Sequence, residues 1–423
     1  MLKRLCPIFV FVSGLIAGDI AAKGNLADVE LVLDDEVIIA QASAKLRAHN
    51  LVWGPKGEIW INTGETEPGL LRSEDQGKTW ESVSVNLPSV PLGQHLAGFH
   101  ITREGRLWLV HQLPPLLLGG KHVPTNDQRG FVSISSDRGL TWQTTEIDAR
   151  DFAPDARQDP YTSIEIAWCH PNFVEQPDGT VFFSLSMRYD DWDDFSQADQ
   201  SRPGIRDVMI RTADGGATWG DPTIVHQHAT ETAYAVDPHN PDRILAATRI
   251  QRKALPGEDL TSIRKRSAMD MTPPNYMPEW AYKNGLLLES IDGGRSFREV
   301  PDGLFGFGSY RWSAVWTNAN WLILASNAGQ DPGQKRNFGD HVVRISLDGG
   351  RSWLDGTTDG TSAPNKAKKF VVVPAYRDIG KMDHYSAGVP ATVELSPNRF
   401  LTLASYKRDK ILKGRIWHLE NLP

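Results

Sequence analysis

The chain has 423 residues and a formal net charge of −7, and its charged residues are interspersed without a basic stripe. Proteins that bind nucleic acid need clustered Lys and Arg, so a nucleic-acid partner is not expected. The length suits two or three average domains or one large all-β domain. Cys6 and Cys169 are the two cysteines.

The first 22 residues have the pattern of a secretory signal peptide. Lys3 and Arg4 precede an apolar run at residues 7–17, and small residues follow it. This order is typical of a cleavable export signal, so residues 1–22 are predicted to be removed and the protein to be secreted or periplasmic. The apolar run is too short to span a bilayer comfortably, so no membrane span is expected in residues 23–423. The export signal would take Cys6 with it, which leaves no intramolecular disulfide.

The rest of the chain reads as pairs of alternating strands joined by polar turns. The first pair covers residues 50–53 and 58–62, around a Gly-Pro-Lys-Gly turn. Almost nothing after the signal shows helical periodicity. Later strands and turns are expected at residues 97–101 with 106–111, 173 with 181–185, around the turn 237–242, around the turn 317–320, at 391–395 with 400–406, and at 415–419.

One short stretch is written five times, in the form S/T-x-D-x-G-x-T/S-W/F. Its clearest copy is residues 135–142, and the others are 73–80, 212–219, 290–297 and 346–353. An Asp that accepts hydrogen bonds from turn amides, a Gly that takes positive φ and a terminal aromatic suit a tight turn beside a core. Five copies in one chain indicate a repeated β-unit.

This is the Asp-box pattern, and with it the chain resembles the sialidase (BNR-repeat) superfamily. The resemblance implies an all-β fold, a six-bladed β-propeller, as a single domain over residues 23–423, each blade a four-stranded antiparallel sheet. The boxes would lie on turns between outer strands. Residues 29–40 are expected to form a strand that completes the last blade and closes the ring. The motif is structural and assigns no chemistry by itself.

The resemblance also implies a site for sialic acid, a sugar with a carboxylate on its anomeric carbon. Arginine suits such a substrate because its planar guanidinium pairs with a carboxylate through two hydrogen bonds. A carboxylate nucleophile would repel the substrate, and sialidases use a tyrosine instead. A nearby glutamate must then activate the phenol.

Three of these parts match the first and fourth blades. Arg47 stands ahead of the first blade, where the family has its first arginine, although the Ile-Pro that follows it in the family is absent here. Glu231 and Arg249 match a glutamate on the first strand and an arginine at the end of the second strand of the fourth blade.

The remaining parts match the fifth and sixth blades. Arg336 follows a Ser-Asn-Ala stretch and is chosen over Arg344 as the third arginine. Tyr385, in His-Tyr-Ser, matches the nucleophile ahead of the sixth blade. The resemblance thus implies substrate binding by Arg47, Arg249 and Arg336, and attack by Tyr385 assisted by Glu231.

The acid/base residue departs from the family pattern. Family members carry an Asp in the loop after the second strand of the first blade, whereas residues 63–69 contain none. Glu65 and Glu67 are the candidates to protonate the leaving group and later activate water. Asp127 and Asp159 are more distant candidates.

No metal or other cofactor is expected, because the five histidines of the second- and third-blade regions follow no metal-binding spacing such as His-Glu-x-x-His. The predicted function is an exo-α-sialidase-like glycoside hydrolase that removes terminal sialic acid or a related acidic sugar from glycoconjugates. The alternatives are a propeller glycosidase or polysaccharide lyase on another acidic sugar, and a non-catalytic carbohydrate-binding or assembly propeller. The partner would be an acidic-sugar glycan, and the oligomeric state is not predicted. The five histidines are His95, His100, His111, His122 and His170.

Overall fold

Among the residues that the structure describes, regular structure is almost entirely β-strand, as expected. No helix among the described residues is long and apolar enough to cross a membrane. The computed structural model describes residues 26–41, 50–63, 69–86, 95–112, 117–118, 121–122, 129–148, 151–152, 162–165, 173–189, 205–252, 282–306, 310–327, 340–357, 360–374, 386–387, 390–406 and 410–423. The predicted signal peptide lies outside them.

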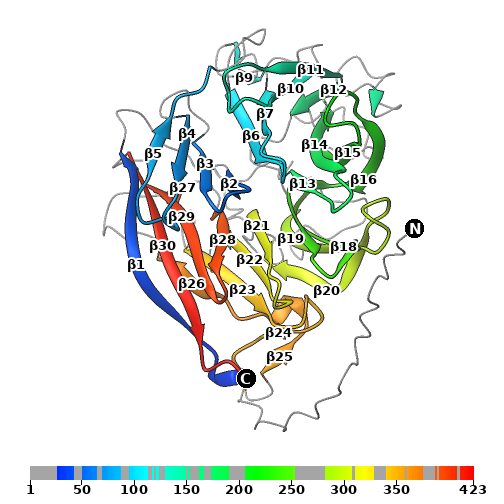
Figure 1. Cartoon of the computed structure of the whole chain (residues 1–423). Coiled ribbons are helices and arrows are strands. Elements are labelled where there is room, and N and C mark those ends of the chain that lie inside the picture. The colour runs from blue at the N-terminus through cyan, green and yellow to red at the C-terminus, as the bar shows by residue number, and fades with distance from the viewer. Residues whose placement is uncertain are drawn as a thin grey trace, which may run out of the picture.

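Six antiparallel sheets form the blades of a β-propeller (Figure 1). The first three blades are β2 (Asn50–Trp53), β3 (Ile59–Asn62), β4 (Leu70–Ser73) and β5 (Glu81–Val83); β6 (His95–Ile101), β7 (Leu107–Gln112), β10 (Arg129–Ser135) and β11 (Gln143–Asp148); and β12 (Thr162–Glu165) with β13 (Val174–Glu175), β14 (Val181–Tyr189), β15 (Ile205–Thr212) and β16 (Gly220–His226).

The other three blades follow the same order from the inner to the outer strand. They are β17 (Ala229–Asp237), β18 (Asn240–Arg252), β19 (Tyr282–Ser290) and β20 (Arg298–Gly306); β21 (Tyr310–Trp316), β22 (Leu322–Asn327), β23 (His341–Ser346) and β26 (Phe370–Val373); and β27 (Ser386–Ala387) with β28 (Thr392–Ser396), β29 (Arg399–Tyr406), β30 (Ile411–Glu420) and β1 (Glu30–Gln41). Two small hairpins, β8 (Leu117–Leu118) with β9 (Lys121–His122) and β24 (Trp353–Leu354) with β25 (Thr361–Ser362), are extra.

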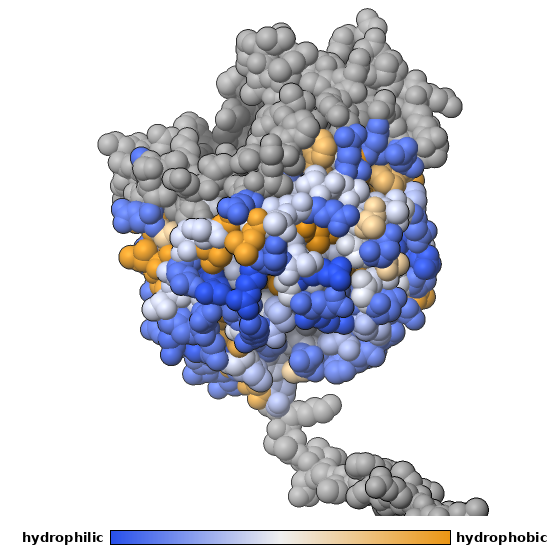
Figure 2. Space-filling view, turned by 45° about the horizontal axis from the view of Figure 1, so that its top comes forward, coloured by the Kyte–Doolittle hydropathy of each residue, from blue (hydrophilic) through white to orange (hydrophobic). Residues whose placement is uncertain are grey.

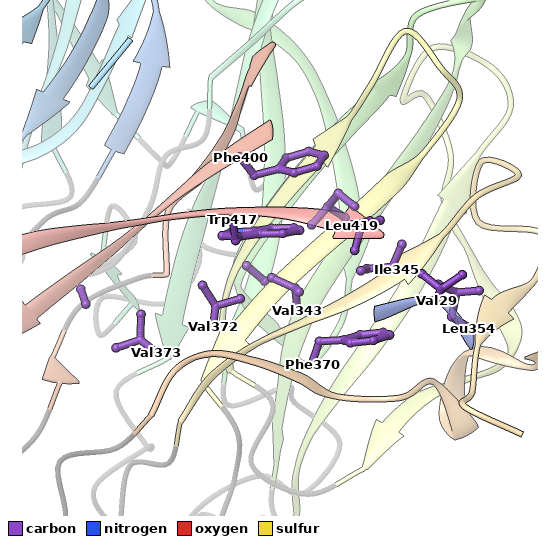
Figure 3. Packing of buried hydrophobic residues seen from close by; sticks show 13 residues of the cluster. Val29, Val343, Ile345, Leu354, Phe370, Val372, Val373, Phe400, Trp417 and Leu419 are labelled. Atoms are coloured by element: carbon purple, nitrogen blue, oxygen red, sulfur yellow. The ribbon is translucent and has the colours of Figure 1, made fainter. Parts of the chain in front are cut away.

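Neighbouring blades pack face to face, and a separate apolar cluster fills each of the six junctions. Between the fifth and sixth blades, Val343 and Ile345 meet Phe400, Trp417 and Leu419 (Figure 3). The rings of Phe400 and Trp417 stack with their centroids 4.4 Å apart. Each blade is therefore buried on both faces, and the core of the molecule is a ring of interfaces.

The ring closes as predicted, because β1 pairs with β30 as the outer strand of the sixth blade. The register runs from Glu30 opposite Glu420 to Gln41 opposite Ile411. The first and last strands consequently lie side by side (Figure 1). Across this pair, Glu36 forms ion pairs of 2.7 Å with Lys413 and Arg415.

The five repeated stretches fold into the same turn, after the third strand of the first five blades. In the clearest copy, Asp137 accepts hydrogen bonds from the amides of Leu140 and Thr141, and the amide of Gly139 donates to Ser135. Hydrogen bonds to Asp137 lower the pKa of its carboxyl to about 2; the largest cause is the Thr141 hydroxyl, followed by the Thr141 amide and the Ser135 hydroxyl. Gly139 has φ +86°. The predicted turn geometry is confirmed.

Some local expectations were wrong. The fourth-blade turn is shorter than residues 237–242, since β17 ends at Asp237 and β18 begins at Asn240. The fifth blade carries an unpredicted hairpin, β24 and β25, between its repeated turn and its outer strand. The inner strands of the third and sixth blades are each split into two pieces that pair with the same neighbour.

The described part of the surface in Figure 2 is mostly hydrophilic, and its hydrophobic residues occur in small groups. Exposed large apolar side chains, such as Ile38 on β1, Leu140 and Ile291, come from different blades. Scattered apolar residues of this kind are normal on the surface of a folded protein.

The repeated turn also sets the distance between blades, which a glycine substitution can test. A Cβ added at Gly139 would lie 2.6 Å from Val85 Cγ1 of the preceding blade. Gly179 has the same φ of +86°, and nothing lies within 4 Å of its added Cβ. Both alanine variants carry the backbone strain, so Gly139→Ala is expected to lower the free energy of unfolding by roughly 1–3 kcal/mol more than Gly179→Ala. Thermal or urea unfolding measures the difference, and equal losses would contradict the packing role.

Candidate functional site

Strand direction divides the propeller into two faces. Successive strands are antiparallel, so the repeated turns and the turns between first and second strands share one face. The starts of the first strands and the ends of the second strands share the opposite face. We call this opposite face the loop face. It includes the starts of β2, β17 and β27 and the ends of β3, β18 and β22.

Two predicted residues meet on the loop face. Glu231 is the third residue of β17, and Arg249 lies near the end of β18. Arg249 Nη1 is 2.8 Å from Glu231 Oε2, and the two side chains are only 10% and 5% exposed. Removing both charges from water is costly, and the cost is offset only by close pairing of this kind. The loop face of the fourth blade therefore contains a buried carboxylate, that of Glu231, paired with the guanidinium of Arg249.

The backbone at Glu231 departs from regular strand geometry. The pairing of β17 with β18 shifts register between Thr230 and Ala233, which marks a bulge. Glu231 has φ +55° inside this bulge. A non-glycine residue in this region costs on the order of 1–3 kcal/mol. Such strain persists only where the surrounding structure maintains it, and it is concentrated at functional sites.

A buried polar cluster lies between the third and fourth blades. At its centre is Asp207 of β15, which is 0% exposed and accepts hydrogen bonds from the hydroxyls of Ser186 and Thr232. Ser186 is also hydrogen-bonded to Thr230 at 3.1 Å, and Thr232 to Thr248 at 2.8 Å. We call these five residues the Asp207 cluster. They share faces of their strands with apolar residues of the junction between these two blades.

Asp207 was not predicted from sequence. Burial raises its pKa to about 6, a rise that the Ser186 and Thr232 hydroxyls oppose; the charge of Glu231 adds to it and that of Arg249 reduces it. In the sequence, Asp207 follows Arg206 and resembles an ordinary charged strand residue. The only signal was its position in a strand whose next residues, Val208 and Met209, are apolar.

The other predicted site residues lie outside the described residues, so their roles stay predictions. In chain order they fall next to strand ends of the loop face: before β2, between β3 and β4, between β22 and β23, and directly before β27. They are Arg47, Glu65, Glu67, Arg336 and Tyr385; the distant acid candidates Asp127 and Asp159 also lie outside.

Arg344, the arginine not chosen, is enclosed at the junction of the fourth and fifth blades. It is 1% exposed and donates to the Ser326 hydroxyl at 2.9 Å. Its guanidinium carbon lies 5.1 Å and 5.6 Å from the ring centres of Phe305 and Trp312. Burial lowers its pKa to about 10.

The histidines do not form a metal site within the part of the chain that the structure describes, where no group of three His, Cys, Asp or Glu could hold an ion. His111 is 0% exposed, and burial lowers its pKa to about 4, so it is neutral near pH 7. His100 lies 3.8 Å from Glu175. His170 and the side chains of His95 and His122 lie outside the described residues.

Removing the cation tests the charge balance of the site. Arg249→Met would leave Glu231 and Asp207 as buried carboxylates without their guanidinium. Breaking a buried pair from one side costs about 3–5 kcal/mol, so a lower melting temperature is expected at pH 8. The loss should be smaller at pH 5, where a carboxylate can take up a proton. Adding Glu231→Gln to Arg249→Met should recover part of the loss, and a single variant as stable as wild type at pH 8 would contradict the pairing.

The fold has known counterparts, although sequence comparison finds none: no family model matches the chain, and neither does any curated protein. A protein of unknown function from Dyadobacter fermentans aligns with a TM-score of 0.54 at 16% identity, covering 93% of this chain and 99% of the other.

Two structures of sialidases are similar to the same extent. The Hadza microbial sialidase Hz136 aligns with a TM-score of 0.54 at 15% identity, over 88% of this chain and 65% of that one. The chain thus spans about two thirds of Hz136. A leech intramolecular trans-sialidase, in complex with 2,7-anhydro-Neu5Ac, aligns with a TM-score of 0.52 at 11% identity, over 92% and 70% of the two chains. The protein therefore has a sialidase-like six-bladed β-propeller fold.

Proposed function

We propose that the protein is an exported exo-α-sialidase-like glycoside hydrolase that removes terminal sialic acid, or a related acidic sugar, from glycoconjugates. The observation that carries the proposal is the buried Glu231–Arg249 pair, 2.8 Å apart, on the loop face of the fourth blade. In a sialidase-like propeller, this is the blade on which the resemblance expects the activating glutamate and a carboxylate-binding arginine. The strained backbone at Glu231 supports a functional role for this residue.

In the proposed complex, Arg47, Arg249 and Arg336 bind the substrate carboxylate. Arg249 is held by Glu231 before the substrate arrives, so its guanidinium is already oriented and little side-chain entropy remains to be lost. The substrate carboxylate then competes with Glu231 for the same cation. This competition weakens the hold of Arg249 on Glu231 and makes that carboxylate a better proton acceptor.

The chemistry is proposed to proceed with retention of configuration. Tyr385 attacks the anomeric carbon, and Glu231 accepts the phenol proton as the new bond forms. Glu65 or Glu67 protonates the departing glycosidic oxygen and then removes a proton from the water that releases the sugar. In this scheme each proton transfer is assigned to a side chain of this protein.

The test of the nucleophile is release of a fluorogenic aryl group from an α-sialoside. Wild-type protein is expected to release it, and Tyr385→Phe to lower kcat/KM by about 10³-fold or more, because the attacking oxygen is gone. Circular dichroism and thermal unfolding of Tyr385→Phe serve as the control, because a folded variant with wild-type stability ties the loss of activity to the missing hydroxyl. A folded wild-type protein without activity on aryl or natural sialosides would refute the proposal, and binding without cleavage would favour a carbohydrate-binding propeller.

Glu65→Gln and Glu67→Gln separate the two acid/base candidates. An aryl leaving group barely needs protonation, whereas a natural sugar leaving group does. Loss of the acid is therefore expected to lower hydrolysis of a natural sialoside by about 10²–10⁴-fold, and release of the aryl group by much less. The two rates are compared for each variant. If both variants keep full activity on the natural linkage, neither glutamate is the acid.

A further inference from the structure

Both chain neighbours of Glu231 are connected to one buried carboxylate. Thr232, which follows Glu231, donates directly to Asp207. Thr230, which precedes it, is hydrogen-bonded to Ser186, and Ser186 donates to the other oxygen of Asp207. The bulge with φ +55° is thus fixed at its two ends by a residue of a different blade.

The direction of these hydrogen bonds follows from the charge of Asp207. An ionised carboxylate only accepts, so Ser186 and Thr232 must both donate to it. A protonated Asp207 must instead donate to a hydroxyl. If it donates to Thr232, that hydroxyl turns toward Thr248, which lies 2.8 Å away, and Thr248 in turn donates to the Thr230 carbonyl at 3.2 Å. In both charge states of Asp207 the hydroxyls of the Asp207 cluster have hydrogen-bond partners. In the protonated state the hydrogen bonds run from Asp207 through Thr232 and Thr248 to the Thr230 carbonyl, which belongs to the peptide group directly before Glu231.

On the basis of the proposed function, we propose that Asp207 is a positioning residue for Glu231. It holds Thr230 and Thr232 so that the Glu231 carboxylate stays against Arg249, and its negative charge favours proton uptake by Glu231. Asp207 touches no substrate in this scheme. It acts from the third blade through the strand that carries the proposed proton acceptor.

Few other charges act on Asp207 among the described residues. Glu231 raises its pKa, by less than burial does, and Arg249 lowers it. Tyr234 on β17 also interacts electrostatically with Asp207. His226, opposite Asp207 on β16, lies 3.5 Å from Glu299. Titration of Asp207 is therefore coupled mainly to the Glu231–Arg249 pair, and the pair and Asp207 take up protons as a linked set.

The test in activity is the pH profile of kcat for Asp207→Asn with the fluorogenic sialoside. The substitution keeps the size of the side chain and removes the charge. We expect kcat to fall by about 10–100-fold above about pH 6, where Asp207 is ionised, and the acidic limb of the profile to move to lower pH, because the linked set loses one of its two carboxylates. A merely structural role would lower kcat without moving the limb. An unmoved limb would overturn the proposal.

Two substitutions at Thr232 separate the hydrogen bond from packing. Thr232→Val keeps the shape and removes the donor to Asp207, so it is expected to lower kcat as Asp207→Asn does. Thr232→Ser keeps the hydroxyl and should restore most of kcat. Ser133→Ala, which removes another buried hydroxyl that is paired with Thr144 at 2.8 Å in the second blade, controls for general loss of stability. If Thr232→Val is as active as wild type, Asp207 does not act through this hydroxyl.

A stability measurement tests Asp207 independently of activity. The raised pKa means that the folded protein keeps a proton that the unfolded chain releases, so stability present below about pH 4 is lost as the pH rises through about 6. Asp207→Asn should remove this loss. The melting losses of Asp207→Asn and Glu231→Gln at pH 8 should also be non-additive by about 2 °C or more. If wild type is inactive but both effects appear, the proposed function fails and the coupling stands; strictly additive losses would overturn the coupling itself.

Discussion

The structure depends on one repeated interaction, the apolar contact between neighbouring blades. A four-stranded sheet with two apolar faces cannot stay folded alone, and each of the six clusters draws residues from two sheets. The glycine of each repeated turn allows this contact. In the second blade Gly139 brings its turn against Val85, and in the fifth blade Gly350 brings its turn against Leu245. The turn thus has a packing role between blades, in addition to joining two strands.

The candidate site lies where polar residues replace the apolar contact between two blades. Below the loop face, the junction of the third and fourth blades is filled by residues such as Met209 and Tyr234. Toward the loop face the same junction becomes polar, with Asp207 and its hydroxyl partners. The rigid sheet on either side can hold a strained residue such as Glu231, because the strain is small beside the burial of two whole blade faces. A charged pair on a free loop would have no comparable support.

Features that depend on residues close together in the sequence could be predicted, whereas features that depend on contacts between blades could not. The turns and most strands were predicted because their signals are local: an Asp, a Gly and an aromatic in eight residues, or alternating apolar residues. The hairpin β24–β25 was missed because its strands have two residues each, too few for periodicity. Glu231 and Arg249 were found through the family pattern, and their pairing was not. Asp207 was missed because its role depends on residues of another blade, and nothing in Ile-Arg-Asp-Val-Met indicates which strand lies across from it.

The pairing of β1 with β30 has a consequence for how the molecule is made. The strand that completes the sixth blade, β1, precedes the first blade in the chain, while its partner β30 follows all the other described strands. β1 therefore emerges from the ribosome long before its partner β30. Until β30 emerges, the sixth blade lacks its two outer strands, β30 and β1. The ring of blades then stays open at the sixth blade. Joining segments so far apart in the chain is entropically unfavourable and slow, so closure of the ring is expected to be a late step that follows the emergence of β30.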